Sequence, residues 1–201
     1  MAPSPSPLPR RLAEAAEVSR SLDSLAAALR PAADALASAP GWGSLLRGRS
    51  VGHALHPTLT DVPIGLWLSS SVLDLAGQES RRSADRLLGL GILAAAPTAL
   101  TGLADWRRGG DRVRRVGALH AVLNTGGLAL YTASWLLRRR GRRGAGVAVS
   151  LLATGVVGVS GYLGGHMILV LDSPHESMDE LDELDDLASV DDAEPADIDL
   201  T

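Results

Sequence analysis

Imidazole and carboxylate side chains are the groups of this chain that could hold a metal or a haem. In the segment GHALHPTLTDVPIGLW, His53 and His56 stand three residues apart and Asp61 follows them. Cysteine is absent from the 201 residues, which excludes disulfides, thiolate zinc sites and cysteine-ligated iron–sulfur clusters within the chain. A bound metal or haem would therefore use histidine, carboxylate, methionine or backbone ligands.

Two further histidines, His120 and His166, lie in long apolar segments, and Asn124 follows His120 by about one helical turn. The amide of Asn124 could bind a ligand or orient the imidazole. Paired imidazoles between helices are typical of b-type haem sites, which also need clearance for the macrocycle. Glycines at three-residue steps before His166 indicate either close helix packing or room for such a macrocycle. They are Gly155, Gly158, Gly161 and Gly164, with Gly165 beside the last.

Four apolar segments must position these side chains: residues 60–77, 86–104, 116–137 and 145–171. Each is close to the length of about 20 residues that crosses a hydrocarbon core of about 30 Å. The last two contain no charged residue, whereas a helix on the surface of a soluble protein needs a polar face. The sequence therefore predicts an all-α, four-helix transmembrane bundle over residues 51–171, with a soluble helical bundle as the alternative.

Four crossings would bring four of the five histidines to one membrane face, here called side A. His53 and His56 precede the first crossing, His120 lies four residues into the third, and His166 lies five residues before the end of the fourth. At about 1.5 Å per residue, His120 and His166 would lie about 6–8 Å inside the membrane. Histidines that act only as polar anchors at the interface are the alternative. Two carboxylates also fall at this face: Asp61 and Asp105.

The first two segments carry features that are unusual in lipid. Asp74 lies within the first segment, and Pro97 interrupts the second. A carboxylate inside a membrane needs a partner, and three arginines follow Asp74 beyond the end of its segment. We therefore predict a structural ion pair between Asp74 and one of Arg81, Arg82 and Arg86.

Residues 1–50 and 172–201 flank the predicted membrane domain. The spacing predicts a helix over residues 8–38 that Pro31 breaks, with an apolar stripe that lies on the membrane or docks on a partner. This stripe consists of Val18, Leu22, Leu25 and Leu29, and the headgroup level suits Trp42, Arg47 and Arg49 after it. Residues 172–201 hold 13 acidic side chains and no arginine or lysine, so we expect a disordered acidic tail.

Without that tail, the chain carries 19 arginines against 10 acidic residues. Near the membrane, seven arginines lie on side A and eight on the opposite side B, so the positive-inside rule does not separate the two orientations. Residues 1–11 lack the apolar core of a signal peptide, and the other orientation would translocate a long arginine-bearing head. We therefore expect side A, with both termini, to be cytoplasmic. Nucleic-acid binding lacks support, because the arginines border apolar segments and no aromatic platform accompanies them.

Four motifs carry a resemblance to a known family: GHALHPTLTDVPIGLW, ADRLLGLGILAAAPTALTGLADW, RRVGALHAVLNTGGLALYTASWLLR and GYLGGH. Together, over about residues 52–169, they resemble the bacterial membrane family called domain of unknown function 2231. The resemblance implies a four-helix membrane domain, in some relatives followed by a Rieske-type iron–sulfur domain. The family's motif positions carry over to His53, His56, His120 and His166, and to Asp61, Asp74 and Asp105.

Two departures from the family pattern bear on function. The usual GHPLHP is GHALHP here, so Ala54 replaces a proline before the first segment. No Rieske domain follows, because its cluster needs two cysteines and the chain has none. If the family supports electron transfer, the redox or Rieske-type partner of this chain would be a separate protein.

Three functions are compatible with these residues, all in the bacterial inner membrane, with the lipid bilayer as a partner and self-association undecided. The first is a module that binds haem b, with His120 and His166 as axial ligands and with His53 and His56 holding a second haem or lining a quinone or proton route. The second is a scaffold that recruits a partner protein and has no enzyme activity of its own. The third is a metal-dependent membrane hydrolase, in which zinc or iron is held by His53, His56 and Asp61 with Asp105 as base.

Overall fold

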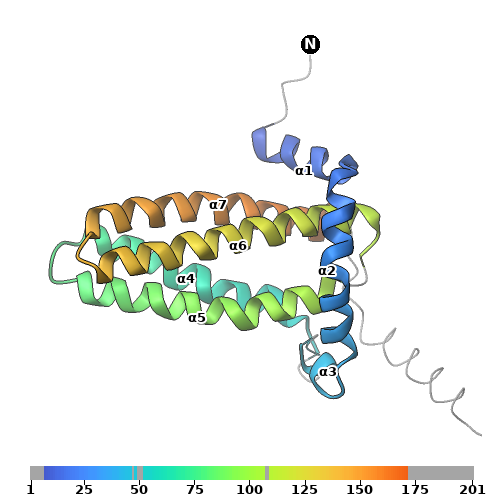
Figure 1. Ribbon diagram of the computed structural model, residues 1–201, viewed down its shortest axis with the longest axis horizontal. Helices are drawn as coiled ribbons and strands as arrows, with labels where there is room; N and C mark the ends of the chain where they lie inside the picture. Colours follow the sequence, from blue (N-terminus) through green and yellow to red (C-terminus); the bar gives the residue numbers. More distant parts are fainter. Residues whose placement is uncertain (1–6, 47, 49–51, 107–108, 172–201) are drawn as a thin grey trace, which may run out of the picture.

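The described part of the chain is entirely helical. The computed structural model describes residues 7–46, 48, 52–106 and 109–171, which contain no strand. Its helices are α1 (Leu8–Val18), α2 (Ser21–Ser38), α3 (Trp42–Leu46), α4 (Leu55–Leu75), α5 (Arg81–Trp106), α6 (Asp111–Arg139) and α7 (Arg143–Leu169) (Figure 1). The all-α prediction is confirmed, whereas the predicted acidic tail, Arg47 and Arg49 lie outside the described residues.

The four long helices, α4 to α7, run side by side and alternate in direction (Figure 1). The most extensive contacts join α4 to α5 and α6 to α7, so the four helices form two hairpins. Fewer contacts join α5 to α6 and α4 to α7. This places α4 and α6 on a diagonal, with a seam between the hairpins. Gly141 allows the tight α6–α7 turn, because its φ of 77° is in the left-handed region that favours glycine.

The helices α1 and α2, together called the arm, lie across one end of the long helices (Figure 1). In the arm, α2 contacts α5 and α6, and α1 contacts α6 and α7. We call this the arm end, which corresponds to side A, and we call the opposite end the turn end. The turn end holds the α4–α5 and α6–α7 connections.

The predicted break at Pro31 is wrong. The helix α2 continues through Pro31, and the arm bends instead near Ser19, between α1 and α2. Proline removes one backbone hydrogen bond, which a helix held by tertiary contacts can tolerate. The bend falls where the arm changes its neighbours, and the hydroxyls of Ser19 and Ser21 meet there at 2.8 Å. Similarly, α5 is not interrupted at Pro97.

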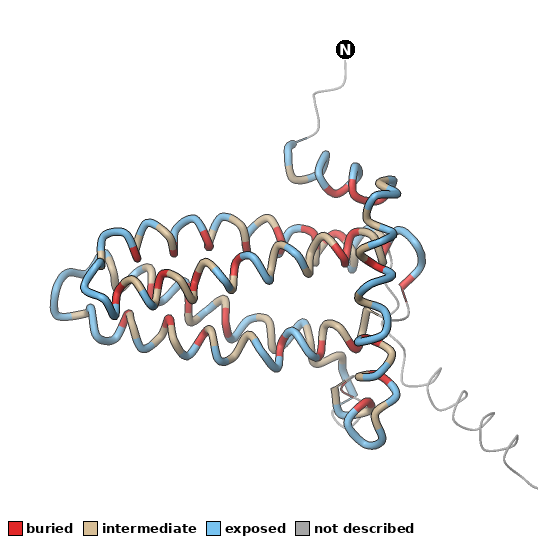
Figure 2. Tube along the Cα trace, viewed as in Figure 1, coloured by how far each residue is buried: buried red, intermediate tan, exposed pale blue. Residues whose placement is uncertain are grey.

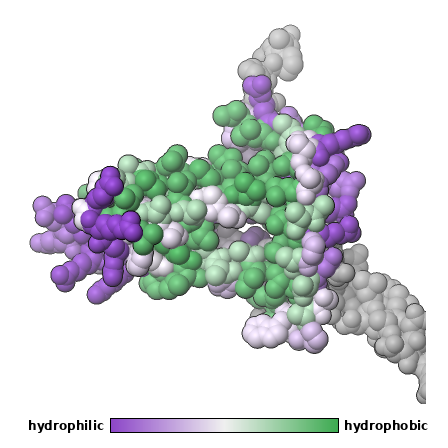
Figure 3. Space-filling view, viewed as in Figure 1, coloured by the Kyte–Doolittle hydropathy of each residue, from purple (hydrophilic) through white to green (hydrophobic). Residues whose placement is uncertain are grey.

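Besides an apolar core, the long helices bury several polar side chains and expose many large apolar ones, which is unusual for a soluble protein. Figure 2 shows buried positions on the faces that meet, and Figure 3 shows hydrophobic surface along the length between the two ends. Among the exposed side chains, Leu75 is 87% and Leu93 is 70% accessible. The buried polar side chains include Ser70, Thr98, Thr101, Ser134, Arg138, Ser150 and Ser160.

Two of the described helices, α5 and α7, are long and apolar enough to cross a membrane by length and composition alone. Only 28% and 33% of the residues in their most apolar stretches are buried. A core helix of a soluble protein would be mostly buried, so their exposure favours a lipid environment. The other two long helices, α4 and α6, do not meet this composition criterion.

An aromatic stack closes the middle of the seam. Trp67 of α4 and Tyr131 of α6 stack at 4.1 Å between ring centroids, and the hydroxyl of Tyr131 meets that of Thr154 on α7 at 3.0 Å. The indole of Trp67 lies directly against Gly91 of α5. Both aromatic rings are buried. The stack therefore separates the polar groups of the arm end from those of the turn end.

Candidate functional site

Asp74 lies in an ion cluster at the turn end rather than beside the predicted arginines. Arg138 of α6 donates to both oxygens of Asp74 at 3.0 and 2.7 Å, and Arg143 of α7 also pairs with Asp74. Arg143 reaches Asp85 of α5 at 2.9 Å as well. The predicted pairing of Asp74 with Arg81, Arg82 or Arg86 is therefore wrong. The face of α4 that carries Asp74 is turned toward α6 and α7, whereas those three arginines lie on exposed positions of α5.

The charged groups of the ion cluster form hydrogen bonds with one another and with neighbouring serine hydroxyls. The side chain of Arg138 has no exposed surface, and that of Asp74 is 2% exposed. Arg138 also donates to the hydroxyls of Ser134 and Ser150, at 3.2 and 2.9 Å. A buried charge needs this many partners to offset its desolvation. Because the cluster joins all four long helices with its groups already paired, its chemistry is structural.

Two imidazole rings lie close together between the long helices, near the arm end. His56 of α4 and His120 of α6 lie with ring centroids 6.3 Å apart and ring planes at 88° to each other. They come from helices on the diagonal, so the pair spans the seam between the two hairpins. Sequence reasoning paired His120 with His166 instead. The structure brings His120 together with His56.

The peptide oxygens behind the two rings fix their tautomers. Nδ1 of His56 lies 2.9 Å from the carbonyl oxygen of Thr98, and Nδ1 of His120 lies 2.8 Å from that of Ser160. A carbonyl oxygen can only accept, so each Nδ1 carries the proton and each Nε2 keeps its lone pair. Asn124 is consistent with this assignment, because its amide lies 2.9 Å from Nε2 of His120, where it can donate.

The two Nε2 atoms differ in what they contact. Nε2 of His120 accepts from Asn124, so one of the two predicted roles of Asn124, orienting the imidazole, is seen directly. Nε2 of His56 has no hydrogen-bond partner among the described residues. A neutral imidazole with a backbone-anchored Nδ1 and an available Nε2 is the form in which histidine binds metals and haem iron.

Glycines make room for both rings. A β-carbon on Gly102 of α5 would lie 2.6 Å from Cε1 of His56, and one on Gly164 of α7 would lie 3.3 Å from Cε1 of His120. Most of the predicted glycine series on α7 does not pack against a neighbouring helix. A β-carbon added to Gly155, Gly158 or Gly161 would meet no neighbouring atom within 4 Å. Of these glycines at three-residue steps, only Gly164 packs closely, so the others form no helix–helix contact within the described chain.

His166 belongs to a separate contact that fastens the arm. Its Nε2 lies 2.7 Å from Oε1 of Glu17 on α1, and both side chains are buried. Arg112 pairs with the other oxygen of Glu17 at 3.2 Å, and the ring of Tyr162 stacks beside His166. Sequence reasoning missed Glu17. Its signal was a single carboxylate beside Ala13 and Ala16, which form the buried face of α1.

The predicted apolar stripe of the arm is only partly correct. Leu22, Leu25 and Leu29 are half-buried against the long helices, whereas Val18 is exposed. A second ion pair holds α2, because Arg115 contacts both oxygens of Asp23 at 2.6 and 3.1 Å. The Arg115 guanidinium lowers the pKa of the Asp23 carboxyl below its usual range.

The residues of the predicted hydrolase site are not assembled into a metal centre. His53 and Asp61 are exposed, and Asp105 is half-buried with an interaction of its own. Among the described residues, no three histidine or acidic side chains are grouped so that they could hold a metal ion. The geometry therefore gives no support to a zinc or iron site at His53, His56, Asp61 and Asp105.

The region that carries the imidazole pair and the ion cluster also carries the family signature. A family model described as a predicted membrane protein, DUF2231, matches residues 52–172. The chain belongs to this family. The matched DUF2231 region contains α4 to α7 and leaves out the arm. No curated protein and no solved structure matches the chain.

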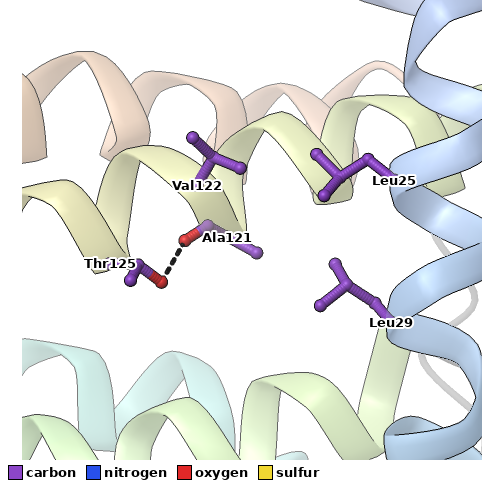
Figure 4. A pocket seen from close by; sticks show the side chains of 5 residues that line it. All are labelled: Leu25, Leu29, Ala121, Val122 and Thr125. Carbon is purple, nitrogen blue, oxygen red and sulfur yellow. Dashed lines mark hydrogen bonds between the residues drawn. The ribbon is translucent and has the colours of Figure 1, made fainter.

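A small apolar cavity lies beside the DUF2231 region, between the arm and α6. It has a volume of about 170 Å³ and is lined by Leu25 and Leu29 of α2 and by Ala121, Val122 and Thr125 of α6 (Figure 4). The hydroxyl of Thr125 is already bonded to the carbonyl of Ala121 at 2.8 Å. The cavity thus offers apolar walls at the same level of α6 as His120 and Asn124.

Proposed function

We propose that α4 to α7 form a four-helix transmembrane bundle in the bacterial inner membrane. Four features support this: exposed apolar side chains on all four helices, buried polar ones between them, an ion cluster shielded inside, and membership of a family of predicted membrane proteins. The inward-facing serines, histidine and charged groups of α4 and α6 explain why these two helices are less apolar in composition. Each would still present leucine and valine to lipid.

The same proposal sets the topology. The first of the four helices begins at the arm end and the last one ends there (Figure 1), so the segments before and after the bundle lie on one side. We place that side in the cytoplasm, because the opposite orientation would move the whole arginine-bearing arm across the membrane. A reporter enzyme fused after Thr201 should be active only in its cytoplasmic form, and activity of a periplasmic reporter would reverse this orientation.

We further propose that the bundle is a redox module that binds haem b through His56 and His120. The single observation that carries the proposal is the perpendicular imidazole pair, with each Nδ1 held by a peptide oxygen. Neutral imidazoles on two facing helices, each with Nδ1 held by a peptide oxygen, are the residues that would hold the haem iron. The two ring centroids lie 6.3 Å apart across the seam between the hairpins.

The residues around the pair define its chemistry. A bound haem would supply one-electron transfer, with its potential set by the ligands and by the burial of the site. The carbonyls of Thr98 and Ser160 hold the rings and determine which nitrogen carries the proton. Binding at Nε2 of His120 would replace the hydrogen bond from Asn124. Because these 201 residues contain no cysteine, a Rieske-type electron partner would have to lie outside them.

The test is the haem content of single variants purified from haem-replete cells. His56→Ala and His120→Ala should each lose most of the haem. His53→Ala and His166→Ala should keep it, since His53 is exposed and His166 is bound to Glu17. A colourless wild-type protein would overturn the haem proposal. Haem loss in His166→Ala but not in His56→Ala would show instead that His120 and His166 hold the haem, as the sequence predicted.

A membrane scaffold is the second candidate, and the surface of α1 favours it. Leu8 is 67% and Val18 is 73% exposed on a helix that is otherwise fastened to the bundle. Apolar side chains exposed at both ends of a docked helix would suit contact with a partner protein. In native membranes, Leu8→Ser with Val18→Ser should reduce the apparent size of the complex on native gels. An unchanged size would show that Leu8 and Val18 do not bind a partner, and the scaffold hypothesis would lose this support.

A further inference from the structure

Six exposed arginines gather at the turn end of the long helices. Figure 3 shows this end as a strongly hydrophilic cap on a hydrophobic surface. We call these side chains the arginine rim, and they belong to the first turns of α5 and to the α6–α7 turn. They are Arg81, Arg82, Arg86, Arg139, Arg140 and Arg142.

Three acids lie near the arginine rim, and Glu79, which precedes α5, forms no ion pair with it among the described residues. Asp74 and Asp85 are already paired with Arg138 and Arg143 in the ion cluster. None of the six arginines forms an ion pair within the described part of the chain. Arg139 only covers the ring of Trp135, at 5.1 Å.

At the arm end, the three arginines that begin α6 are paired, and the exposed Arg11, Arg20 and Arg30 are spread over the arm. Each of the three that begin α6 has an acidic partner among the described residues: Arg112 with Glu17, Arg114 with Asp111, and Arg115 with Asp23. Among the described residues, the two ends therefore differ in how closely their unpaired arginines are grouped. The clustered ones lie at the turn end.

The two halves of the arginine rim are neighbours. The contact between Arg143 and Asp85, at 2.9 Å, joins the start of α7 to the start of α5. Arg142 and Arg86 adjoin these two residues in the sequence. Just inside the rim, apolar side chains are exposed, including Leu90 at 51%. Clustered positive charge thus borders an apolar surface.

We propose that the arginine rim binds the headgroups of anionic phospholipids. The inference rests on the proposed membrane insertion and is independent of haem. Guanidinium groups bind phosphate oxygens with paired, charge-assisted hydrogen bonds, and the apolar belt below them fits acyl chains. The acidic residues 172–201 are not the occupant within one molecule, because α7 ends at the arm end, on the other side of the bilayer.

The experiment is thermal unfolding of the full chain in mild detergent, with added dioleoyl phosphatidylglycerol or dioleoyl phosphatidylcholine. A ligand that binds only the folded state raises the midpoint. We expect phosphatidylglycerol to raise it by several degrees and phosphatidylcholine to leave it unchanged. The triple variant Arg139→Gln, Arg140→Gln, Arg142→Gln should lose this gain while keeping the wild-type midpoint in phosphatidylcholine, and the matching lysine variant should keep part of it.

A charge-matched control removes three exposed arginines of the arm instead: Arg11→Gln, Arg20→Gln and Arg30→Gln. These are spread over the arm, so the control should retain the lipid-dependent gain. Equal gains with both lipids, the same gain with inorganic phosphate alone, or equal losses in the two triple variants would each overturn the proposal. If the gain is absent although the protein requires detergent, only the arginine rim fails. If the protein stays soluble without detergent, the membrane proposal fails with it.

Discussion

The ion cluster at the turn end and the imidazole pair at the arm end are both polar groups enclosed by the same four helices, with the two imidazoles half-buried. In the ion cluster, Arg138 finds two oxygens of Asp74 and two serine hydroxyls, so its donors are used. In the imidazole pair, the backbone holds each ring from behind, and Nε2 of His56 keeps its lone pair available. Burial alone therefore does not mark a functional site. The difference lies in whether the partners of a buried group are all supplied by the protein.

The largest expected effect comes from breaking the ion cluster. Arg138→Gln leaves the carboxylate of Asp74 buried with fewer partners, and loss of one member of a buried pair costs about 3–5 kcal/mol of unfolding free energy. The neighbouring Arg139→Gln removes the same charge from an exposed position and should cost far less. Denaturation in detergent, followed by tryptophan fluorescence, would compare them. Equal stabilities would contradict the structural role of the cluster.

A smaller loss should follow from filling the space beside the imidazole pair. Gly102→Ala would place a β-carbon 2.6 Å from Cε1 of His56, and overpacking of this kind costs about 1–3 kcal/mol. It should also lower the affinity for haem, because the ring must shift. Gly158→Ala meets no atom within 4 Å and, as a helical glycine-to-alanine change, should be neutral or stabilising. If Gly102→Ala keeps both stability and haem, the close contact at His56 is wrong.

The contact between Glu17 and His166 should control the arm and leave the rest of the bundle intact. Glu17→Ala removes a buried hydrogen bond to a charged group, worth about 1.5–3 kcal/mol. We expect limited proteolysis of the arm to become at least about tenfold faster, since about 1.4 kcal/mol is a factor of ten. Glu14→Ala is the control, because Glu14 is exposed and pairs with Arg10 on the same helix. Equal cleavage of the two variants would place the fastening of the arm elsewhere.

The smallest effect concerns the pair of Asp23 and Arg115. Because Arg115 lowers the pKa of Asp23 in the folded state, the pair stabilises at pH values above the ordinary carboxyl pKa of about 3.9. This stabilisation is lost as the pH falls through the lowered value. The difference in arm cleavage between wild type and Asp23→Asn should thus stay constant from about pH 5 to 8 and vanish in stronger acid. A difference that changes near neutral pH would assign the effect to another group.

Much of the architecture could be predicted from apolar segment length. The four long helices, the family and the orienting role of Asn124 follow from residues close together in sequence. The contact between His120 and His56 does not, because it crosses the diagonal between hairpins. His120 faces Ser160 on α7, and His166 lies six residues further on. At about 100° per residue, six residues turn the helix by about 240°, so His166 points to another side of α7.

The partners of Asp74 and His166 could not be predicted for a related reason. Arginines just after the first segment are close to Asp74 in sequence, yet α5 turns them outward while α6 and α7 present Arg138 and Arg143 to it. Glu17 reaches His166 from 149 positions away along the chain. Such pairings depend on which helix faces meet, and residue spacing within one segment carries no information about that.

The spin state of a bound haem allows the most direct test of the central claim, that His56 and His120 would hold a haem. Two imidazole ligands would give a low-spin ferric haem, which electron paramagnetic resonance detects. We predict this signal in detergent-solubilised protein from haem-replete cells, unchanged in His166→Ala and abolished in His56→Ala. A colourless protein, or a low-spin signal that persists in His56→Ala and disappears in His166→Ala, would contradict this claim.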